Sequence, residues 1–540
     1  MPDASRTALD YHRRTRHRLP DKFARSLGFL DWDNQPNPFR LFEGSERVAL
    51  ARNPGTAGPS LDEAYDPSRV EPRPVNAESL AQLLFDSMAL SAWKQLQTSR
   101  WSPRCNPSSG NLHPTEAYVI TDLAELGAAP GPMLWHYTPL LHALERRARL
   151  APELWQALRG EAEGVFVGLS SIHWREAWKY GERAYRYCQH DVGHAIAALA
   201  IAAAGLGWQL RALPSVDDPS LARLLALSET PEGPEPEHPD LLLFAGPRPP
   251  THALDLPESL DLEISGEPNE LSAEHQRWPI IDTVTEACVR HDVPTPPTEP
   301  RLWTGPEPSP TRSQAELRSI VRTRRSAVAL DGETSISREA WLRMLARTMP
   351  RPGHVPFASL IPDRPRVHLL GFVHRVDGVE PGLYLLLRDP DARERIAAAM
   401  HEGFGWSPVD TGALELPLFL LEPHDTRRAA KVVSCHQDIA ADGAFALAML
   451  AELGPAIEER GAWMYRHLHW EAGTIGQVLY LEAEAAGVRG TGIGCFFDDG
   501  VAKIIGVEDA RLASIYHFTL GGPVEDERLT LLDAYHHLDE

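Results

Sequence analysis

Four short segments of the chain carry side chains that could do chemistry. The first, Asn106 to Pro114 (NPSSGNLHP), combines turn formers with small donors directly before a predicted strand, Glu116 to Ile120. Such a loop can bring amides and hydroxyls close to a planar ligand, and a guanidinium beside serine hydroxyls can hold an anionic or carbonyl group. An ordinary surface turn is the alternative. The candidate ligand-binding residues here are Arg104, Pro107, Ser108, Ser109, Gly110 and Asn111.

The second segment, Trp178 to Tyr187 (WKYGERAYRY), enters a predicted long helix. Its adjacent Lys179 and Tyr180 offer a proton donor and a proton acceptor, and burial or mutual charge can bring the pKa of either group toward the working range. They are candidates for a catalytic proton-transfer pair. The alternative is the start of an amphipathic helix, where lysine and tyrosine commonly extend to the surface.

The third segment, Arg324, Arg325 and Ser326, lies between two predicted helices. Two guanidinium groups and a hydroxyl suit a phosphate ester. A basic helix end that faces water is the alternative, since cations are favoured near a helix C-terminus.

The fourth segment is Gly490 to Phe496 (GTGIGCF), in which Gly492, Ile493 and Gly494 could let the backbone pass close to a ligand. A glycine turn that caps a helix is the alternative. The segment is not a dinucleotide fingerprint, because its glycines follow a helix instead of a strand.

His190 and His194 lie four residues apart and could face one side of a helix. The zinc-protease pattern needs a glutamate directly after the first histidine, where this chain has Asp191. We expect packed histidines here and no metal.

An internal repeat positions these segments. Residues Tyr185 to Leu227 align with Tyr465 to Val507 at a constant offset of 280, without a gap, as in a diverged duplication. The two copies differ where chemistry is expected. At the offset of 280, Lys179 and Tyr180 align with Glu459 and Arg460, and Ala212 to Pro214 aligns with Gly492 to Gly494. We infer two similar halves that build one shared site.

Length and charge bound the class of protein. A chain of 540 residues exceeds what one hydrophobic core usually serves. The net charge of -22 opposes binding to nucleic acid or to anionic membranes. The longest apolar stretch, Ala195 to Leu206, is too short to cross a bilayer, and no secretory signal precedes it. Five scattered cysteines argue against a disulfide framework, so a reducing cytoplasm is expected.

Each half is predicted to mix strands with a long buried helix, which indicates an α+β fold. The long helices are expected at about Arg175 to Leu206 and Trp463 to Ala486. A proline-rich linker at 256–312 separates a domain at 1–255 from a domain at 313–540, with some packing expected around Trp278 to Val289. The predicted strands are Glu116 to Ile120, Leu134 to Tyr137, Gly164 to Leu169, Leu241 to Ala245, Val367 to Val373, Leu383 to Leu387, Leu416 to Leu421 and Ile515 to Leu520, and the other predicted helices are Asn76 to Lys94, Gln314 to Thr323 and Ser337 to Thr348.

Together these segments resemble the flavin-dependent nitroreductase superfamily, in particular its SagB/ThcOx (McbC-like) dehydrogenase branch. NPSSGNLHPTEAYV resembles the Pro-Ser loop of that branch, and WKYGERAYRYCQHDVGH resembles its Lys-Tyr helix. In the second half RRS resembles the flavin-phosphate signature, and YRHLHWEAG with GTGIGCFFDDGVAKIIGV resembles the C-terminal part. The resemblance covers most of the chain, twice.

The resemblance implies flavin mononucleotide (FMN) at the interface of two fused nitroreductase-like domains, each with a central mixed sheet flanked by helices, in an intramolecular pseudo-dimer. One half would give the loop at Pro107 to Asn111 and the other Arg324, Ser326 and Gly492 to Gly494. The reciprocal site looks eroded, because Phe357 to Pro362 does not reproduce the loop. A second basic residue of the family's pattern is replaced by Val328, and Arg528 is the candidate to contact the phosphate instead.

By the same resemblance Lys179 and Tyr180 would take a proton while flavin accepts hydride, as in azoline dehydrogenation, with oxygen as the final acceptor. The expected substrate is a small molecule or a peptide-derived heterocycle, and other peptide-modifying enzymes are candidate partners. The alternatives are an NAD(P)H-dependent nitro or quinone reductase and a non-catalytic scaffold of a peptide-modifying complex. Substrate identity, the direction of electron flow and further association of the chain stay open.

Overall fold

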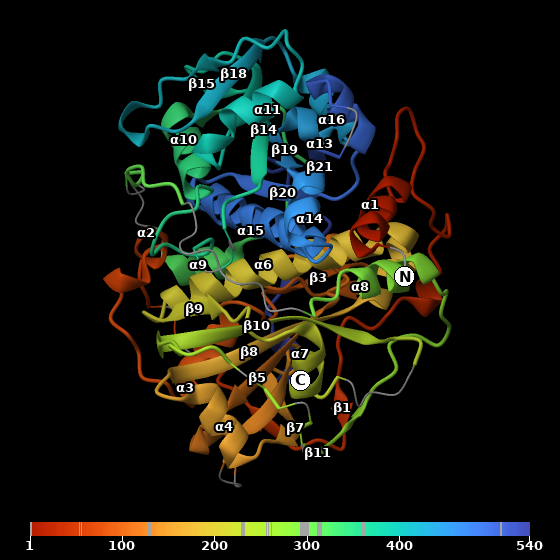
Figure 1. Cartoon of the computed structure of the whole chain (residues 1–540), viewed down its shortest axis with the longest axis vertical. Helices are drawn as coiled ribbons and strands as arrows, with labels where there is room; N and C mark the ends of the chain where they lie inside the picture. The colour runs from red at the N-terminus through yellow and green to blue at the C-terminus, as the bar shows by residue number, and fades with distance from the viewer. Residues whose placement is uncertain are drawn as a thin grey trace.

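The structure is a computed structural model that describes residues 3–52, 55, 57–127, 131–227, 233–254, 256–257, 259–260, 262–291, 302–309, 316–358, 360, 363–507 and 510–539. Two layered halves lie one above the other, the first drawn from red to green and the second from green to blue (Figure 1). Each half contains one large sheet and one long helix that faces the other half.

The sheet of the first half has the strand order β11-β7-β6-β5-β8-β10-β9, with β2 paired to β7. Apolar side chains on both faces of its central strands are buried, because helices cover one face and loops with short helices the other. Its strands are β2 (Arg47–Ala49), β5 (Thr115–Thr121), β6 (Met133–Thr138), β7 (Ala143–Arg149), β8 (Glu163–Ile172), β9 (Gln209–Ala212), β10 (Glu237–Arg248) and β11 (Glu263–Ile264).

The sheet of the second half has the order β17-β18-β16-β14-β19-β21-β20. Its run β16-β14-β19-β21-β20 matches the run β6-β5-β8-β10-β9 of the first half, so the repeat extends to sheet topology. The strands are β14 (Val367–Val373), β16 (Gly382–Leu386), β17 (Ser407–Pro408), β18 (Leu418–Pro423), β19 (Phe445–Ala451), β20 (Arg489–Ile493) and β21 (Ala513–Gly521).

Helices complete the layers. The principal ones are α1 (Ala4–Arg14), α3 (Ala77–Phe85), α4 (Pro152–Arg159), α5 (His173–Tyr180), α6 (Ala184–Ala204), α7 (Asp218–Leu224), α8 (Pro279–Ala287), α9 (Leu317–Thr323), α10 (Arg338–Arg347), α11 (Arg393–Ala399), α12 (Arg427–Val433), α13 (Ile439–Asp442), α14 (Leu453–Arg460), α15 (Met464–Ala485) and α16 (Asp498–Ile505). Both α6 and α15 lie between the two sheets, and for this reason α6 is buried along its whole length (Figure 1).

The two long helices meet at equivalent glycines. Gly193 of α6 and Gly473 of α15 occupy the same position in the repeat, and a Cβ on either would lie about 3 Å from the Cα of the other. Only residues without a side chain allow the helices to pack this closely. The Thr474 hydroxyl donates a hydrogen bond of 3.0 Å to the Gly193 carbonyl at the same crossing.

Two reciprocal ion pairs cross the same interface. Arg186 of the first half donates to Asp498 of the second at 2.7 Å, and Arg466 of the second half pairs with Asp218 of the first. Each residue of one pair is the copy, at an offset of 280, of a residue in the other pair. The chain is thus an α+β pseudo-dimer of two fused domains, as the family resemblance implied and as the two similar halves of the repeat required.

Several local expectations were wrong. Every strand pair described within the two large sheets is antiparallel, so the sheets are not mixed. The helix expected from Arg175 onward is interrupted at Gly181, whose φ of 54° lies in the left-handed region. Gly490 to Ile493 forms the edge strand β20 and not a turn. The central strand β19 was not predicted.

The segment between the sheets is partly ordered. Residues Glu263–Ile264 pair with β7 as β11, and α8 packs against α1. Residues 258, 261, 292–301 and 310–312 of the predicted linker lie outside the described residues. The domain boundaries themselves stay a prediction.

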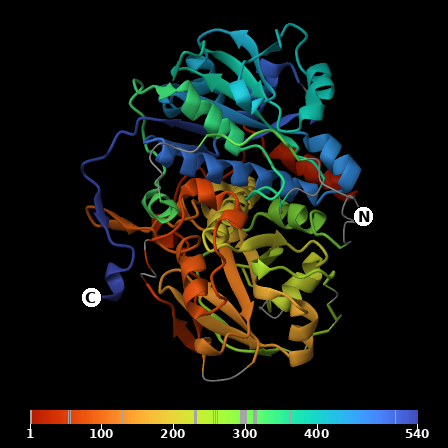
Figure 2. The ribbon, with the colours of Figure 1, turned by 90° about the vertical axis from the view of Figure 1, so that its left-hand side faces the viewer.

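The C-terminal segment of the second half reaches back to the first. Strand β22 (Thr530–Leu532) pairs with β3 (Trp93–Leu96), which also pairs with β4 (Ser99–Trp101), and Tyr535 is buried against Phe85. Figure 2 shows this blue segment beside the orange hairpin. In the part of the chain that the structure describes, no helix is long and apolar enough to cross a membrane.

Candidate active site

A cavity of about 580 Å³ lies where the two halves meet, and we call it the composite cavity. Its volume falls in the range of small-molecule and cofactor sites. The first half supplies Arg104, Pro107, Ser108, Ser109, Gly110, Asn111 and Tyr180, and the second half supplies Arg324, Arg325, Ser326, Gly492, Ile493 and Gly494. The structure therefore brings together 13 of the 15 predicted site residues at one place.

The Pro-Ser loop has the backbone geometry that its residue types favour. Gly110 and Asn111 have φ angles of 62° and 60°, in the left-handed region that glycine and asparagine tolerate best. Asp191 of α6 accepts hydrogen bonds from the Ser109 amide at 3.2 and 3.3 Å. The loop is thus tied to the buried helix beneath it, and its small side chains line the cavity.

Lys179 and Tyr180 lie against this loop. A Cβ on Gly110 would lie 2.8 Å from the Tyr180 hydroxyl and 3.1 Å from Nζ of Lys179, so both polar groups reach the tip of the loop. The Tyr180 ring packs on Tyr187 with centroids 4.4 Å apart. Burial raises the pKa of Tyr180 well above 10, so the phenol stays protonated at neutral pH. Lys179 is not itself a lining residue of the cavity.

One wall of the cavity carries buried cations without an anionic partner. Arg324 donates to the carbonyls of Arg104 and Cys105, and Arg325 donates to the carbonyls of Ser91 and of its own turn. Among the described residues no carboxylate lies within 4.0 Å of the guanidinium groups of Arg104, Arg324 or Arg325, and the Nε atom of each has no partner. Burial lowers the pKa of Arg104 and of Arg325 to about 10. An anionic group bound in the cavity would supply these guanidinium groups with the partner that they lack.

The predicted glycines at the end of β20, Gly492 within the strand and Gly494 just after it, have a structural reason that the sequence did not show. A Cβ on Gly492 would overlap the hydroxyl of Tyr516, and one on Gly494 would overlap the ring of Tyr187. The Gly492 amide donates to the hydroxyl of Tyr480 at 2.8 Å, and that hydroxyl is 2.9 Å from the Ser326 hydroxyl. The glycines thus make room for tyrosines that shape the cavity.

Two buried acids beneath the loop were not singled out from the sequence. Asp191 lines the cavity, and burial raises its pKa to about 7. Burial and the neighbouring Asp191 raise the pKa of Glu176, one turn before Lys179, well above its usual value. At neutral pH this pair therefore holds at least one proton beside the Lys179–Tyr180 pair.

Arg528 is the predicted phosphate contact that the structure does not bring into the cavity. Its side chain is 77 % exposed and pairs with Asp526 at 2.8 Å. Asp526 and Leu529 line the cavity, whereas Arg528 does not. Further lining residues that were not among the predicted site residues include Lys94, His113, His194, Gln437 and Cys495. His113 and Cys495 belong to the first and fourth segments, and His194 was expected to be a packed histidine, whereas no sequence pattern marks Lys94 or Gln437.

A second cavity of about 670 Å³ lies at the reciprocal position. Its wall includes Gln209 to Ala212 of β9, the copies of Arg489 to Gly492. It contains neither a Lys-Tyr pair nor the arginine wall among its described lining residues, of which Arg211 is the one arginine. Residues 359, 361 and 362 of the segment compared with the Pro-Ser loop lie outside the described residues.

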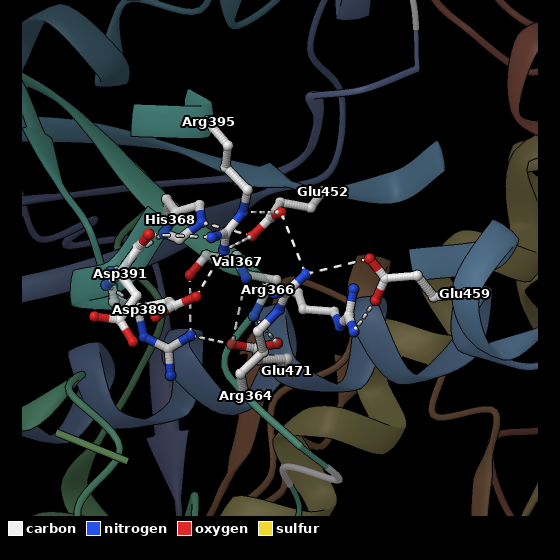
Figure 3. A network of polar contacts seen from close by, with 11 residues as sticks. Arg364, Arg366, Val367, His368, Asp389, Asp391, Arg395, Glu452, Glu459 and Glu471 are labelled. Carbon is white, nitrogen blue, oxygen red and sulfur yellow. Dashed lines mark hydrogen bonds and ion pairs between the residues drawn. The ribbon is translucent and has the colours of Figure 1, made fainter. Parts of the chain in front are cut away.

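The copy of Asp191 has a different environment. Glu471 accepts from the Arg366 amide at 3.2 Å and pairs with the buried Arg388. Figure 3 shows Glu471 beside Arg366, Glu459 and Glu452 in a network of polar contacts, and this carboxylate also accepts from the Val367 amide at 3.4 Å. Asp191 has no basic group within 4.0 Å among the described residues, which leaves it free to hold a proton.

The composite cavity fits a flavin. The unpartnered arginines suit a phosphate, the loop amides and hydroxyls suit a planar ring with carbonyl groups, and the volume is sufficient. Within it Arg324, Arg325 and Ser326 would hold the phosphate, and Ser108 to Asn111 would face the ring.

Comparison with known proteins agrees with this geometry. The model of the nitroreductase family matches residues 69–235 and 378–522, one region in each half. This chain belongs to the nitroreductase family, a group of oxidoreductases whose members generally use flavin cofactors. A search of curated proteins returns no match.

Among solved structures, a nitroreductase-named protein of Anabaena variabilis superposes with a TM-score of 0.67 at 21 % identity, over 96 % of this chain and 99 % of its own. That protein shares the fold across both halves. A nitroreductase-named protein of Ralstonia eutropha has a TM-score of 0.28 at 17 % identity over 42 % of this chain and 98 % of its own. The microcin synthetase McbBCD complex of E. coli has a TM-score of 0.27 at 18 % identity over 46 % of this chain and 93 % of its own. The last two scores are too low to support an argument.

Proposed function

We propose that this protein is an FMN-dependent oxidoreductase of the SagB/ThcOx type that dehydrogenates a heterocycle, converting an azoline of a peptide-derived substrate to an azole with oxygen as the final acceptor. The observation that carries the proposal is the position of Lys179 and Tyr180 against Gly110, at the loop that lines the composite cavity. A proton-transfer pair beside a flavin-sized cavity suits a reaction that removes a hydride and a proton together.

Aromatisation of an azoline removes two hydrogens, one as a hydride and one as a proton. Flavin, when bound, would supply the hydride acceptor. Tyr180 is held protonated by burial, so it serves as a donor that orients a ring nitrogen or carbonyl of the substrate. Nζ of Lys179, which reaches the same loop tip as the Tyr180 hydroxyl, is the group proposed to take the proton.

The buried acids give that proton a destination. Glu176 lies one turn before Lys179, and Asp191 lies beneath the Pro-Ser loop with a pKa of about 7. A group whose pKa is close to the working pH can both receive and release a proton. We therefore include Asp191 as a proton-holding residue of the site, with Glu176 as its positioning neighbour.

Flavin content and the source of electrons test the proposal. The purified protein is analysed for FMN released on denaturation, and the loaded protein is then mixed without oxygen with a thiazoline-containing or oxazoline-containing peptide, or with NADPH. Loss of the oxidised flavin spectrum with the peptide alone supports dehydrogenation. Rapid loss with NADPH alone supports a nitro or quinone reductase.

Absence of flavin binding even in excess FMN would refute the oxidoreductase and favour a scaffold of a peptide-modifying complex. About one FMN per chain is expected, because the reciprocal cavity has no arginine wall among its described residues. Two would contradict the proposal that a single composite site is retained.

A further inference from the structure

Two cysteines that are distant in sequence meet at the wall of the composite cavity. Cys435 follows α12, Cys495 follows β20, and their sulfurs are 2.8 Å apart. A disulfide bond is only about 0.8 Å shorter than this separation. Both residues are partly accessible, and Cys495 is itself a lining residue of the cavity.

The surroundings of Cys495 favour its thiolate. Nδ1 of His17 accepts a hydrogen bond from the Ala24 amide, so its proton lies on Nε2, and the ring hydrogen-bonds to Cys495. The buried guanidinium of Arg183 lies nearby and donates to the Gly494 carbonyl. The hydrogen bond from Cys435, followed by that from His17, lowers the pKa of Cys495 to about 5. The same sulfur contact and burial raise the pKa of Cys435.

The other three cysteines have the opposite character. Cys105, Cys188 and Cys288 are fully buried, and burial raises the pKa of Cys105 to about 11 and that of Cys288 to about 12. A buried thiol of high pKa is a poor nucleophile. The five cysteines thus divide into one adjacent pair at the cavity wall and three buried thiols.

We infer that Cys495 and Cys435 are a peroxide-reactive thiol pair, in which Cys495 is oxidised first and Cys435 then resolves it to a reversible disulfide. The Cys495 thiolate attacks one oxygen of a hydroperoxide and breaks the O–O bond, which gives a sulfenic acid and, from hydrogen peroxide, hydroxide. The Cys435 sulfur then attacks the Cys495 sulfur, the S–O bond breaks, and the disulfide forms with release of water. In total two thiols and one hydrogen peroxide give one disulfide and two waters.

The proposed function would produce hydrogen peroxide in this cavity, a point that rests on that proposal. Oxygen that accepts two electrons and two protons from a reduced cofactor becomes hydrogen peroxide, and Cys495 would be the first thiolate that it meets in the cavity. The reactivity of the pair toward added peroxide does not depend on that source.

Peptide mapping tests the inference on the full chain. The protein is reduced, freed of reductant, treated with hydrogen peroxide, blocked with a thiol reagent and digested. We expect a cross-linked pair of peptides containing residues 435 and 495, and a rate of thiol loss at Cys495 at least tenfold above that at Cys105, Cys188 and Cys288, which serve as internal controls. Dithiothreitol should restore both thiols.

Two variants separate the roles. Cys435→Ser should leave a sulfenic acid on Cys495 that dimedone traps, and Cys495→Ser should slow oxidation of Cys435 to the rate of the buried cysteines. Equal rates at all five cysteines, or oxidation of Cys495 to sulfinic acid without a cross-link in the unmodified chain, would overturn the inference. Because the peroxide is added, a negative result here leaves the proposed function to its own test, and absence of flavin leaves this result interpretable.

Discussion

Replacing Asp191 by asparagine should make the protein more stable at neutral pH. Asp191 is 2 % exposed and accepts from the Ser109 amide, and burial raises its pKa from 3.8 to about 7. At pH values between these two pKa values, Asp191 has lost its proton in the unfolded chain and keeps it in the folded chain. In this pH range the folded state therefore binds more protons than the unfolded state. The contribution of Asp191 to the free energy of unfolding is fully present below pH 3.8 and decreases as the pH rises toward 7.

The structure bounds the size of this effect. Each pH unit between the two pKa values costs about 1.4 kcal/mol, so a rise of about three units gives at most about 4 kcal/mol. Asparagine stays neutral and can still accept from the Ser109 amide. Removing the charge of Asp191 also eases ionisation of Glu176, which shares the pocket. We therefore expect Asp191→Asn to be more stable by about 2 to 4 kcal/mol at pH 8 and about equally stable at pH 4.

Urea unfolding of the flavin-free protein at several pH values between 4 and 8, followed by circular dichroism, measures this difference. Asp240→Asn is the matched control, because Asp240 is equally buried, burial raises its pKa to about 7 as well, and it lies outside the composite cavity. Both variants should flatten the pH dependence of the free energy of unfolding, but only Asp191→Asn should change the pH profile of turnover. If the free energy of unfolding of Asp191→Asn depended on pH in the same way as that of the unmodified chain, the reasoning would be refuted. Asp191 would then be ionised in the folded protein over the whole range from pH 4 to 8.

Three further predictions concern the cations and the proton-transfer pair. Arg324→Met should weaken FMN binding at least about tenfold in a fluorescence titration, because a charge-assisted phosphate contact is lost; Arg528→Met, at an exposed residue outside the cavity, is the control, and equal affinities would contradict a phosphate site at Arg324. Lys179→Met combined with Tyr180→Phe should lower turnover about 100-fold to 10,000-fold while flavin content is retained; normal turnover would exclude proton transfer by the pair. Arg466→Met removes the close ion pair of the buried Asp218, which keeps the more distant Arg290 at 3.7 Å, so we expect a loss of about 1 to 3 kcal/mol in urea unfolding, and an unchanged midpoint would show that this interface pair is not needed.

The pseudo-dimer could be predicted because the repeat keeps a constant offset of 280. Equivalent residues in two copies adopt equivalent conformations, which is why Gly193 meets Gly473 and the two ion pairs are reciprocal. Strand β19 was missed because it is apolar on both faces, and such a run has no period of two that marks a strand.

Part of the candidate site could also be predicted, because several of its residues form short patterns in the sequence. Residues of the Pro-Ser loop, the Arg-Ser segment and the Lys-Tyr pair are recognisable by type and spacing, and all but Lys179 and Arg528 of the predicted set line the composite cavity. Arg528 was proposed only because Val328 replaces a basic residue of the family's pattern. The sequence around Arg528 does not indicate that its side chain is exposed and paired with Asp526.

The sequence by itself determined the duplication, the four segments and the chemistry that their side chains can perform, because periodicity, turn formation and functional groups are properties of neighbouring residues. Only the tertiary structure decided which groups are buried together. Arg324 touches the Arg104 carbonyl across 220 positions, Asp191 has its raised pKa because the helix beneath the loop is enclosed, and Cys435 meets Cys495 across 60 positions. Burial and long-range contact change pKa values and reactivity by removing water and adding charges, and no local pattern in the chain records either.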